Sequence, residues 1–314
     1  MSSQHRVFIA GSRGFIGQAV SRYLNSHGHS VFGVDRRICE NQEGFWSVDL
    51  LDVGRLSMLL EESSPDYIFH VAGLVGSDDE NALYLAHVET TRALLTATKR
   101  ACPSARVIVL GSAAEYGTSV YSSTPIKEDT EPIPETPYGR SKLAQSEVAQ
   151  QLAVELHLDL IRVRVFNTLG PGQGPQLVGG AMVKRLYKCL TENVEHFEVY
   201  DPFSERDYLD VRDVARLLWL GASRVAQNSE RPPIHIASGK GAAVVDLARW
   251  LLQAAGVEDR LSLRLVPGQA RTSLIGESTT LAQLIGKNHI QRFSLYTSLC
   301  DMWEWEVQKQ KQEQ

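Results

Sequence analysis

Two ionisable side chains, Tyr138 and Lys142, stand four residues apart in the segment TPYGRSKLAQSEV. Thr136 can cap a helix that starts here, and Pro137 suits its first turn, so the pair would share one helix face. A phenol ordinarily loses its proton near pH ~10, and an adjacent ammonium group would favour the phenolate. We therefore expect Tyr138 to act as an acid or base nearer neutral pH. A surface helix pair is the alternative where this spacing stands alone.

Ser112 is the third residue that could do chemistry with this pair. It follows the apolar run 107–110, which is typical of a buried strand. Ligands bind outside the carboxyl ends of strands in open α/β sheets, so Ser112 can hydrogen-bond a substrate carbonyl that Tyr138 protonates. Lys142 would tune Tyr138 and bind the nicotinamide ribose. A lone serine at a strand end is more often a turn residue, but the other two residues favour the catalytic interpretation.

A glycine-rich turn near the N-terminus indicates a dinucleotide site. Gly11, Gly14 and Gly17 are spaced G-x-x-G-x-x-G, after the strand-like run 6–10 and before an amphipathic helical pattern. Residues without Cβ let the backbone approach a pyrophosphate, and the helix N-terminus supplies amide donors and partial positive charge. A chance glycine-rich turn is the alternative.

Acidic and basic residues at the next strand ends bear on the choice of cofactor. Asp35 stands 18 residues after Gly17, where a carboxylate can accept hydrogen bonds from the adenosine ribose and favours NAD. Arg36 and Arg37 follow, and a guanidinium group there can hold the 2′-phosphate of NADP. Because Asp35 would repel a phosphate, NAD is the favoured cofactor. Asp49, with Leu50, is a candidate for the adenine edge; a strand-to-helix cap is the equal alternative.

Elements that would position these residues follow an alternating strand and helix pattern. Continuous apolar runs alternating with helices predict a parallel sheet covered on both faces, a doubly wound Rossmann fold of the α/β class. The expected strands are 6–10, 30–34, 45–49, 67–71, 106–110 and 160–165. After Asn167 a Gly- and Pro-rich stretch begins, and a smaller, discontinuous substrate lobe is expected.

The expected division of the chain follows from this change of pattern. The dinucleotide-binding domain would take residues 1–166 and about 207–238, and the substrate lobe about 167–206 and 239–300. The remainder, 301–314, would hold a helix end and a frayed polar tail.

Bulk composition excludes several functions for these 314 residues. A net charge of -5 gives no basic footprint for nucleic acid or a membrane surface, and no run approaches the length of a membrane span. The N-terminus has no secretory signal pattern, and four cysteines without a C-x-x-C pair indicate reduced thiols and no metal site. We expect a cytoplasmic protein.

Taken in order, the motifs of this chain resemble those of the extended short-chain dehydrogenase/reductase family of nucleotide-sugar epimerases, dehydratases and ketoreductases. The likeness covers about residues 5–290 and rests on GSRGFIG, PDYIFHVAG, GSAAEYG, PYGRSK, RVFNTLGPGQ and RDYLDVRD. Within the family the motifs are most similar to those of the GDP-4-keto-6-deoxymannose reductases, in the segments GSAAEYG, FNTLGPGQ and SLIGESTTL.

The resemblance implies roles for particular residues and a homodimer built on two helices from each subunit. Ser112, Tyr138 and Lys142 would form the catalytic triad. The cofactor would be bound by Gly11, Gly14, Phe15, Ile16, Gly17, Asp35, Arg36, Asp49, Leu50, Ala72, Gly73, Tyr138 and Lys142. Asn167 would bind the nucleotide sugar near its phosphates, and Arg206 would meet the diphosphate, where its planar fork suits phosphate oxygens. Loop capping for Asn167 and a surface ion pair with Asp207 or Asp210 for Arg206 are the alternatives.

The chain departs from the family at several positions. Ala113 and Ala114 follow Ser112 where the dehydratases carry acids, which argues against dehydration. Glu115 stands where the epimerases have an aliphatic residue, and the segment that begins at His87 replaces the usual Asn-Val-x-Gly, which puts the nicotinamide-side loop in question. Arg271 is a candidate substitute for a family arginine that is Val266 here.

Three functions follow in order of preference. The first is NAD(P)-dependent reduction of a nucleotide-bound 4-keto sugar, with Tyr138 as the general acid. The second is a nucleotide-sugar 4-epimerase that keeps NAD tightly bound. The third is a catalytically silent dinucleotide-binding sensor, which would require loss of the triad. The sugar and the nucleobase are not encoded in any motif.

Overall fold

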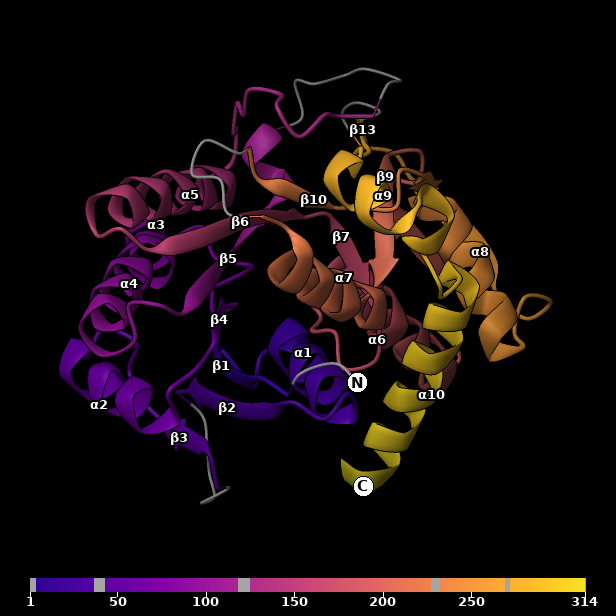
Figure 1. The fold of residues 1–314 in the computed structure, drawn as a ribbon. Coiled ribbons are helices and arrows are strands. Elements are labelled where there is room, and N and C mark those ends of the chain that lie inside the picture. Colours follow the sequence, from indigo (N-terminus) through magenta and orange to yellow (C-terminus); the bar gives the residue numbers. More distant parts are fainter. Residues whose placement is uncertain (1–3, 37–42, 118–124, 227–231, 269–271, 314) are drawn as a thin grey trace.

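The computed structural model describes residues 4–36, 43–117, 125–226, 232–268 and 272–313. Its centre is a seven-stranded parallel sheet in the order β10-β6-β5-β4-β1-β2-β3 (Figure 1). The strands are β1 (Arg6–Ala10), β2 (Ser30–Asp35), β3 (Phe45–Ser47), β4 (Tyr67–His70), β5 (Arg106–Ser112), β6 (Asp159–Val165) and β10 (Ile234–Ile236). All six strands expected from the sequence are confirmed, with ends that differ by at most two residues. The order reverses between β1 and β4, which is where ligands bind in such sheets.

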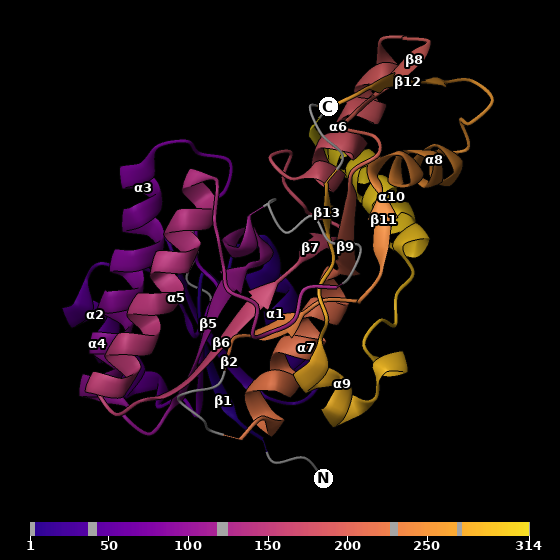
Figure 2. The same cartoon turned by 90° about the horizontal axis from the view of Figure 1, so that it is seen from above.

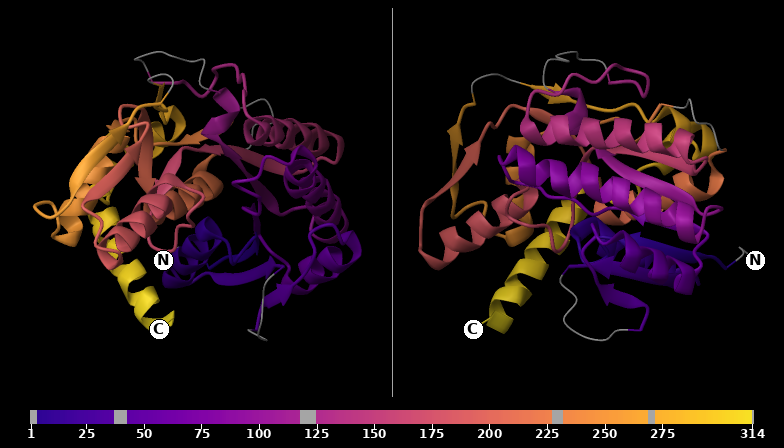
Figure 3. Two further views of the ribbon diagram at one scale, coloured as in Figure 1. Left: turned by 180° about the vertical axis from the view of Figure 1, so that it is seen from behind. Right: turned by 90° about the vertical axis from the view of Figure 1, so that its left-hand side faces the viewer.

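Helices cover both faces of this sheet, as expected. Helices α1 (Phe15–Ser26) and α7 (Val211–Arg224) lie on one face, and α2 (Val53–Ser63), α4 (Thr90–Ala101) and α5 (Pro137–Glu155) lie on the other (Figure 1). Figure 3 shows α4 and α5 side by side. Alternate residues of β1 enter the two cores: Val7 and Ile9 pack toward α1 and α7, while Phe8 and Ala10 pack toward α2 and α4. A strand buried on both faces must be apolar throughout, which explains the continuous apolar runs.

Short helical turns connect these layers near the carboxyl ends of the strands. Helix α3 (Glu80–Tyr84) and a π-helical turn, η1 (Leu85–Glu89), lead into α4. A single 3-10 turn, η2 (Ala113–Tyr116), follows β5.

A smaller lobe is built on two further sheets, set to one side of the large sheet (Figure 2). In it β9 (Glu205–Asp210) pairs with β7 (Asn167–Leu169), β11 (Gly241–Ala243) and β13 (Ser273–Leu274), and β8 (His196–Tyr200) pairs with β12 (Ser262–Val266). Its helices are α6 (Val178–Thr191), α8 (Val244–Ala255) and α10 (Leu295–Glu313). Helix α9 (Thr279–Ile285) and the 3-10 turn η3 (Lys287–His289) lie on the large-sheet side, where α9 packs on β10 and α7.

The boundaries of this lobe differ from the expected ones. The division expected near residue 207 falls inside β9, and α7 is the first element that returns to the large sheet. The tail that was expected to be frayed is helical as far as Glu313, as the continuation of α10, whose buried residues end at Glu306. Across the described ranges, no helix is both long and apolar enough to cross a membrane.

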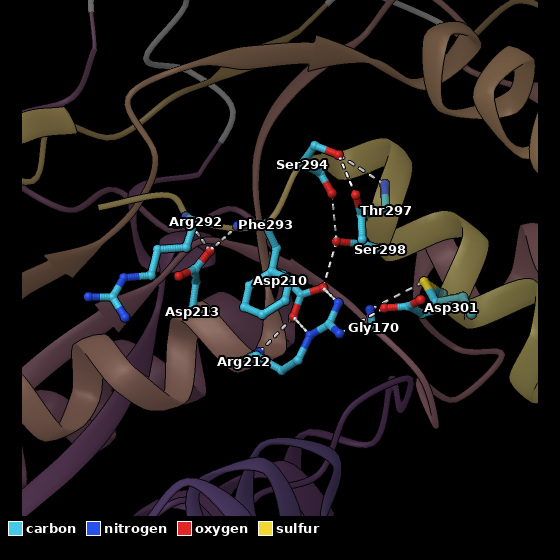
Figure 4. A network of polar contacts seen from close by, with 11 residues as sticks. Gly170, Asp210, Arg212, Asp213, Arg292, Phe293, Ser294, Thr297, Ser298 and Asp301 are labelled. Atoms are coloured by element: carbon cyan, nitrogen blue, oxygen red, sulfur yellow. Dashed lines mark hydrogen bonds and ion pairs between the residues drawn. The ribbon is translucent and has the colours of Figure 1, made fainter. Parts of the chain in front are cut away.

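A buried polar network fastens α10 and the loop before it to the start of α7 (Figure 4). Asp210 caps α7 through the backbone amide of Arg212, at 2.8 Å, and accepts a hydrogen bond from the Ser298 hydroxyl, at 2.6 Å. Asp213 accepts hydrogen bonds from the backbone amides of residues 292–293, at 2.8 and 3.0 Å. Both carboxylates are fully buried and multiply hydrogen-bonded, so they hold the small lobe against the large sheet.

Candidate active site

A cavity of about 380 Å³ opens at the carboxyl ends of β1, β2 and β4 and just beyond β3. Its lining includes eight of the residues expected to bind the cofactor: Gly11, Gly14, Asp35, Arg36, Asp49, Leu50, Ala72 and Gly73. Phe15, Ile16 and Gly17 lie outside this lining, at the start of α1, where Phe15 and Ile16 pack against the core instead. The cavity therefore lies at the topological switch point, where a dinucleotide is expected to bind.

Close packing at the glycine-rich turn requires glycine at two of its positions. Gly11 has a φ of 92°, and a Cβ atom there would stand 2.6 Å from the backbone of Ala72. A Cβ atom on Gly17 would stand 2.1 Å from the carbonyl oxygen of Gly11. The turn thus brings the first turn of α1, with its unpaired amides, against the cavity, and this cradle fits a dinucleotide diphosphate.

At the far end of the cavity, Asp35 and Arg36 stand side by side in its lining. The Asp35 carboxylate accepts a hydrogen bond from the backbone amide of Arg13, at 3.2 Å. Arg37 lies outside the described residues. Asp49 lines the cavity and accepts a hydrogen bond from the amide of Leu51, at 3.0 Å. The cap of α2 is Asp52 and not Asp49, so the alternative role as a helix cap is wrong.

The three catalytic candidates meet at the end of β5. Ser112 is the last residue of β5 and the N-cap of η2, and its side chain is hydrogen-bonded to that of Tyr138. Tyr138 and Lys142 come from the first turns of α5, whose predicted start is confirmed: Thr136 caps the helix through Gly139, at 3.0 Å. The arrangement places a hydroxyl, a phenol and an ammonium group at one strand end.

The pKa values of Tyr138 and Lys142 are shifted differently from what the sequence predicts. Burial raises the pKa of Tyr138, while the hydrogen bond with Ser112 opposes that rise. The expectation that the ammonium group of Lys142 favours the phenolate is wrong for this structure, because that group points elsewhere. It donates to the carbonyl oxygen of Leu110, at 2.5 Å, and to the side chain of Gln145. Burial lowers the pKa of Lys142 to about 8, and Glu115 opposes that shift.

A buried ion pair between Glu115 and Arg164 contacts the backbone of Ser112. The sequence did not predict this pair. The Glu115 carboxylate accepts hydrogen bonds from the amide of Ser112, at 2.8 Å, and from the guanidinium group of Arg164, at 2.7 Å. Both side chains are at most 5% exposed. A Cβ atom on Gly111 would stand 2.4 Å from a Glu115 oxygen, so glycine leaves the space that this carboxylate fills. Two hydrogen bonds therefore fix the end of β5: Lys142 donates to the carbonyl oxygen of Leu110, and Glu115 accepts from the amide of Ser112.

Two further buried residues, Tyr116 and His235, continue the hydrogen-bond network of Glu115 and Arg164. Arg164 also donates to the Tyr116 hydroxyl, at 2.7 Å, and that hydroxyl contacts the His235 ring, at 2.6 Å. The other ring nitrogen of His235 contacts the carbonyl of Glu277, at 3.0 Å. The sequence signal for the network was Arg164 itself, a charged residue between the buried Val163 and Val165 in β6.

The substrate-binding candidates Asn167 and Arg206 lie in the small lobe, where their side chains bond to neighbouring residues of that lobe. Asn167, in β7, donates to the carbonyl of Asp207, at 3.3 Å. Arg206, in β9, donates to the backbone carbonyls of Glu205 and Thr272 and to the Thr272 hydroxyl, at 2.7 to 3.0 Å. Asp207 accepts its hydrogen bonds from Ser238 and neighbouring backbone amides instead. Arg271 lies outside the described residues.

Comparison with known proteins places this site among nucleotide-sugar enzymes. Residues 7–237 match the model of the NAD dependent epimerase/dehydratase family, which is more than half of the chain. The chain is 26% identical over 262 residues to dTDP-6-deoxy-L-talose 4-dehydrogenase (NAD(P)(+)) of Kitasatospora kifunensis, covering 82% of this chain and 81% of that enzyme. It is 29% identical over 281 residues to GDP-6-deoxy-D-mannose reductase of Pseudomonas aeruginosa, covering 85% and 84%.

Solved structures agree with this assignment. MoeE5 in complex with UDP-glucuronic acid and NAD has a TM-score of 0.80 and 25% identity, covering 96% of this chain and 99% of that one. RMD from Pseudomonas aeruginosa complexed with NADPH has a TM-score of 0.83 and 24% identity, covering 97% and 100%, and it supports the fold. The chain therefore belongs to the NAD dependent epimerase/dehydratase family and is an NAD(P)-dependent nucleotide-sugar oxidoreductase or epimerase of the extended short-chain dehydrogenase/reductase type.

Proposed function

We propose that this enzyme reduces the keto group of a nucleotide-bound 4-keto-6-deoxy sugar. The observation that carries the proposal is the hydrogen-bonded pair of Ser112 and Tyr138, in which burial keeps the phenol protonated. A carbonyl reduction needs a proton donor beside the carbonyl oxygen, and a neutral phenol is one. An epimerase uses such a phenol in both directions, so the preference for reduction over epimerisation rests on the relatives considered below.

Each residue of the group then has a defined task. Ser112 donates a hydrogen bond to the substrate carbonyl and orients it toward Tyr138. Tyr138 transfers its proton to that oxygen as the C4–H bond forms. Lys142, whose ammonium group donates to the carbonyl oxygen of Leu110, holds the end of β5 on which Ser112 stands. NAD(P)H bound along the glycine-rich turn would supply the hydride.

Residues after Ser112 and two relatives narrow the reaction. Ala113 and Ala114 stand where a dehydratase needs acids, so no side chain there can move a proton from the sugar ring. The two curated relatives described above are named as a 4-dehydrogenase and a reductase of 6-deoxy sugars. These observations support reduction over dehydration.

An alternative function, 4-epimerisation with tightly bound NAD, is favoured by one observation. The carboxylate of Asp35 lines the cavity at the end of β2, where it suits the ribose of NAD and opposes the phosphate of NADP. The dTDP-L-rhamnose 4-epimerase of Burkholderia thailandensis is 25% identical to this chain in an alignment of 353 positions, gaps included, that covers 97% of the chain. The silent-sensor alternative is disfavoured, because the hydroxyl, phenol and ammonium groups are all present and adjacent.

A binding and turnover series tests the proposal. GDP, UDP, dTDP and CDP are screened for binding with and without NADH and NADPH, and the matching 4-keto-6-deoxy sugar is then assayed for cofactor oxidation. We expect net oxidation of NAD(P)H with one of these substrates and no cofactor retained through purification. Absence of oxidation with every 4-keto sugar, together with NAD that copurifies, would establish the epimerase instead. The cytoplasmic location and the homodimer remain predictions; light scattering tests the latter.

A further inference from the structure

One buried histidine joins the wall of the cofactor cavity to the catalytic helix. His87 lies in the π-helical turn η1 and is 1% exposed. Its ring Nε2 contacts the backbone amide of Leu74, at 3.1 Å, and its Nδ1 contacts the hydroxyl of Ser141, at 2.9 Å. π-Helical turns of this kind occur often at functional sites, since the extra residue turns a side chain inward.

The directions of these hydrogen bonds are fixed by their partners. The Leu74 amide can only donate, so Nε2 accepts and Nδ1 carries the proton. Nδ1–H therefore donates to Ser141, and the Ser141 hydroxyl donates to the backbone carbonyl of Tyr138, at 2.8 Å. The chain of three bonds runs from Leu74 to the residue that carries the phenol.

Ring packing reinforces the same link. The His87 ring meets the Tyr138 ring edge-on, with centroids 5.6 Å apart and an interplanar angle of 78°. A Cβ atom on Gly73 would stand 3.0 Å from Nε2 of His87. Gly73 and Leu74 line the cofactor cavity, so His87 contacts its wall on one side and Tyr138 on the other.

We propose that His87 is a positioning residue that fixes the Gly73–Leu74 wall of the cofactor cavity relative to Tyr138. The inference rests on the proposed function, in which a cofactor bound in that cavity would pass its hydride to a carbonyl carbon whose oxygen Tyr138 protonates. A cofactor ring displaced by a fraction of an ångström from its partner reacts more slowly, because the geometry of near attack is lost.

Burial and the nearby charge of Lys142 lower the pKa of His87 to about 3. The ring stays neutral at every pH at which the enzyme is assayed, so Nε2 remains an acceptor. The link is therefore permanent rather than a pH-dependent switch.

Two substitutions separate the two halves of the link in the full-length protein. His87→Gln retains an acceptor that reaches the Leu74 amide, and His87→Asn retains a donor near Ser141 but leaves Leu74 without its acceptor. His289→Asn, at an exposed histidine in η3, is the matched control. Amide hydrogen exchange at Leu74 and titrations with NADH and with NADPH are measured for each, together with thermal unfolding.

In His87→Asn we expect Leu74 to exchange about tenfold faster and the NADH and NADPH dissociation constants to rise about tenfold, with a loss of kcat of the same order. His87→Gln is expected to keep Leu74 protection and cofactor affinity within about twofold of wild type. Unchanged Leu74 exchange and cofactor affinity in a folded His87→Asn would overturn the proposal. If His87→Asn does not fold, loss of Leu74 protection in a folded His87→Gln overturns it equally. Neither hydrogen exchange nor cofactor titration requires the sugar substrate. Both measurements therefore test the role of His87 even if reductase activity is absent.

Discussion

Burial of Lys142 carries a free-energy cost that depends on pH. The side chain is 4% exposed, and burial lowers its pKa from 10.5 to about 8 against the attraction of Glu115. Between these two pH values the unfolded chain holds a proton that the folded chain has released. Stability therefore rises with pH across this window, because raising pH favours the state that binds fewer protons.

The size of the effect follows from the lowered pKa. At about 1.4 kcal/mol for each pKa unit, the buried ammonium group destabilises the fold by about 3 kcal/mol near pH 7. Most of this cost, about 2 to 3 kcal/mol, is relieved by pH 10. Lys142→Met keeps the length of the side chain and removes its titration.

Urea unfolding of wild type and Lys142→Met from pH 7 to 10 measures the effect. Other titrating groups are common to both proteins and cancel in the difference. We expect the stability of wild type relative to the variant to increase by about 2 to 3 kcal/mol over this range. A difference that stays constant, or that falls with pH, would refute the assignment of a buried, pKa-lowered ammonium group to Lys142.

Three other substitutions test the site. Tyr138→Phe removes the proton donor, so kcat should fall by about 10²–10⁴ with cofactor affinity nearly unchanged; a small loss of kcat would show that another group donates the proton. Glu115→Gln leaves the Arg164 guanidinium buried without its charge partner, and thermal unfolding should show a loss of about 3–5 kcal/mol. The double variant, which also changes Arg164 to Gln, should recover part of that loss, and failure to do so would speak against the pair. Asp35→Ala removes the carboxylate that opposes a 2′-phosphate, so the ratio of NADPH to NADH affinity should rise about tenfold, or 1.4 kcal/mol; an unchanged ratio would place the ribose elsewhere.

Features that depend on neighbouring residues were predictable from the sequence. The six apolar runs predicted their strands because a strand buried on both faces must be apolar at every position. The start of α5 followed from Thr136 and Pro137, whose effects are confined to one helical turn. The glycine-rich turn was recognisable from its local spacing, because a Cβ atom on Gly17 would meet the carbonyl oxygen of Gly11 in the same motif. The close approach of Ala72 to Gly11, which joins the ends of β4 and β1, was not part of that local signal.

Features that depend on distant segments were not predictable in this way. Lys142 was expected to act on Tyr138, yet its partners include Leu110, which lies 32 residues away in β5. Glu115 and Arg164 are 49 residues apart and meet only because β5 and β6 are adjacent. Spacing along one helix gives no information about such partners. The nearest signal was chemical, since a charged residue in a buried strand implies a buried counter-charge.

The most direct measurement of the central claim follows a labelled hydride. The enzyme is incubated with GDP-4-keto-6-deoxymannose and NADH or NADPH carrying deuterium at C4 of the nicotinamide, and the sugar product is examined by NMR. The proposed function predicts deuterium at C4 of the sugar, one cofactor oxidised for each product, and no product with Tyr138→Phe. A 4-keto sugar that is recovered unchanged, with no deuterium in the sugar and no cofactor oxidised, would contradict it.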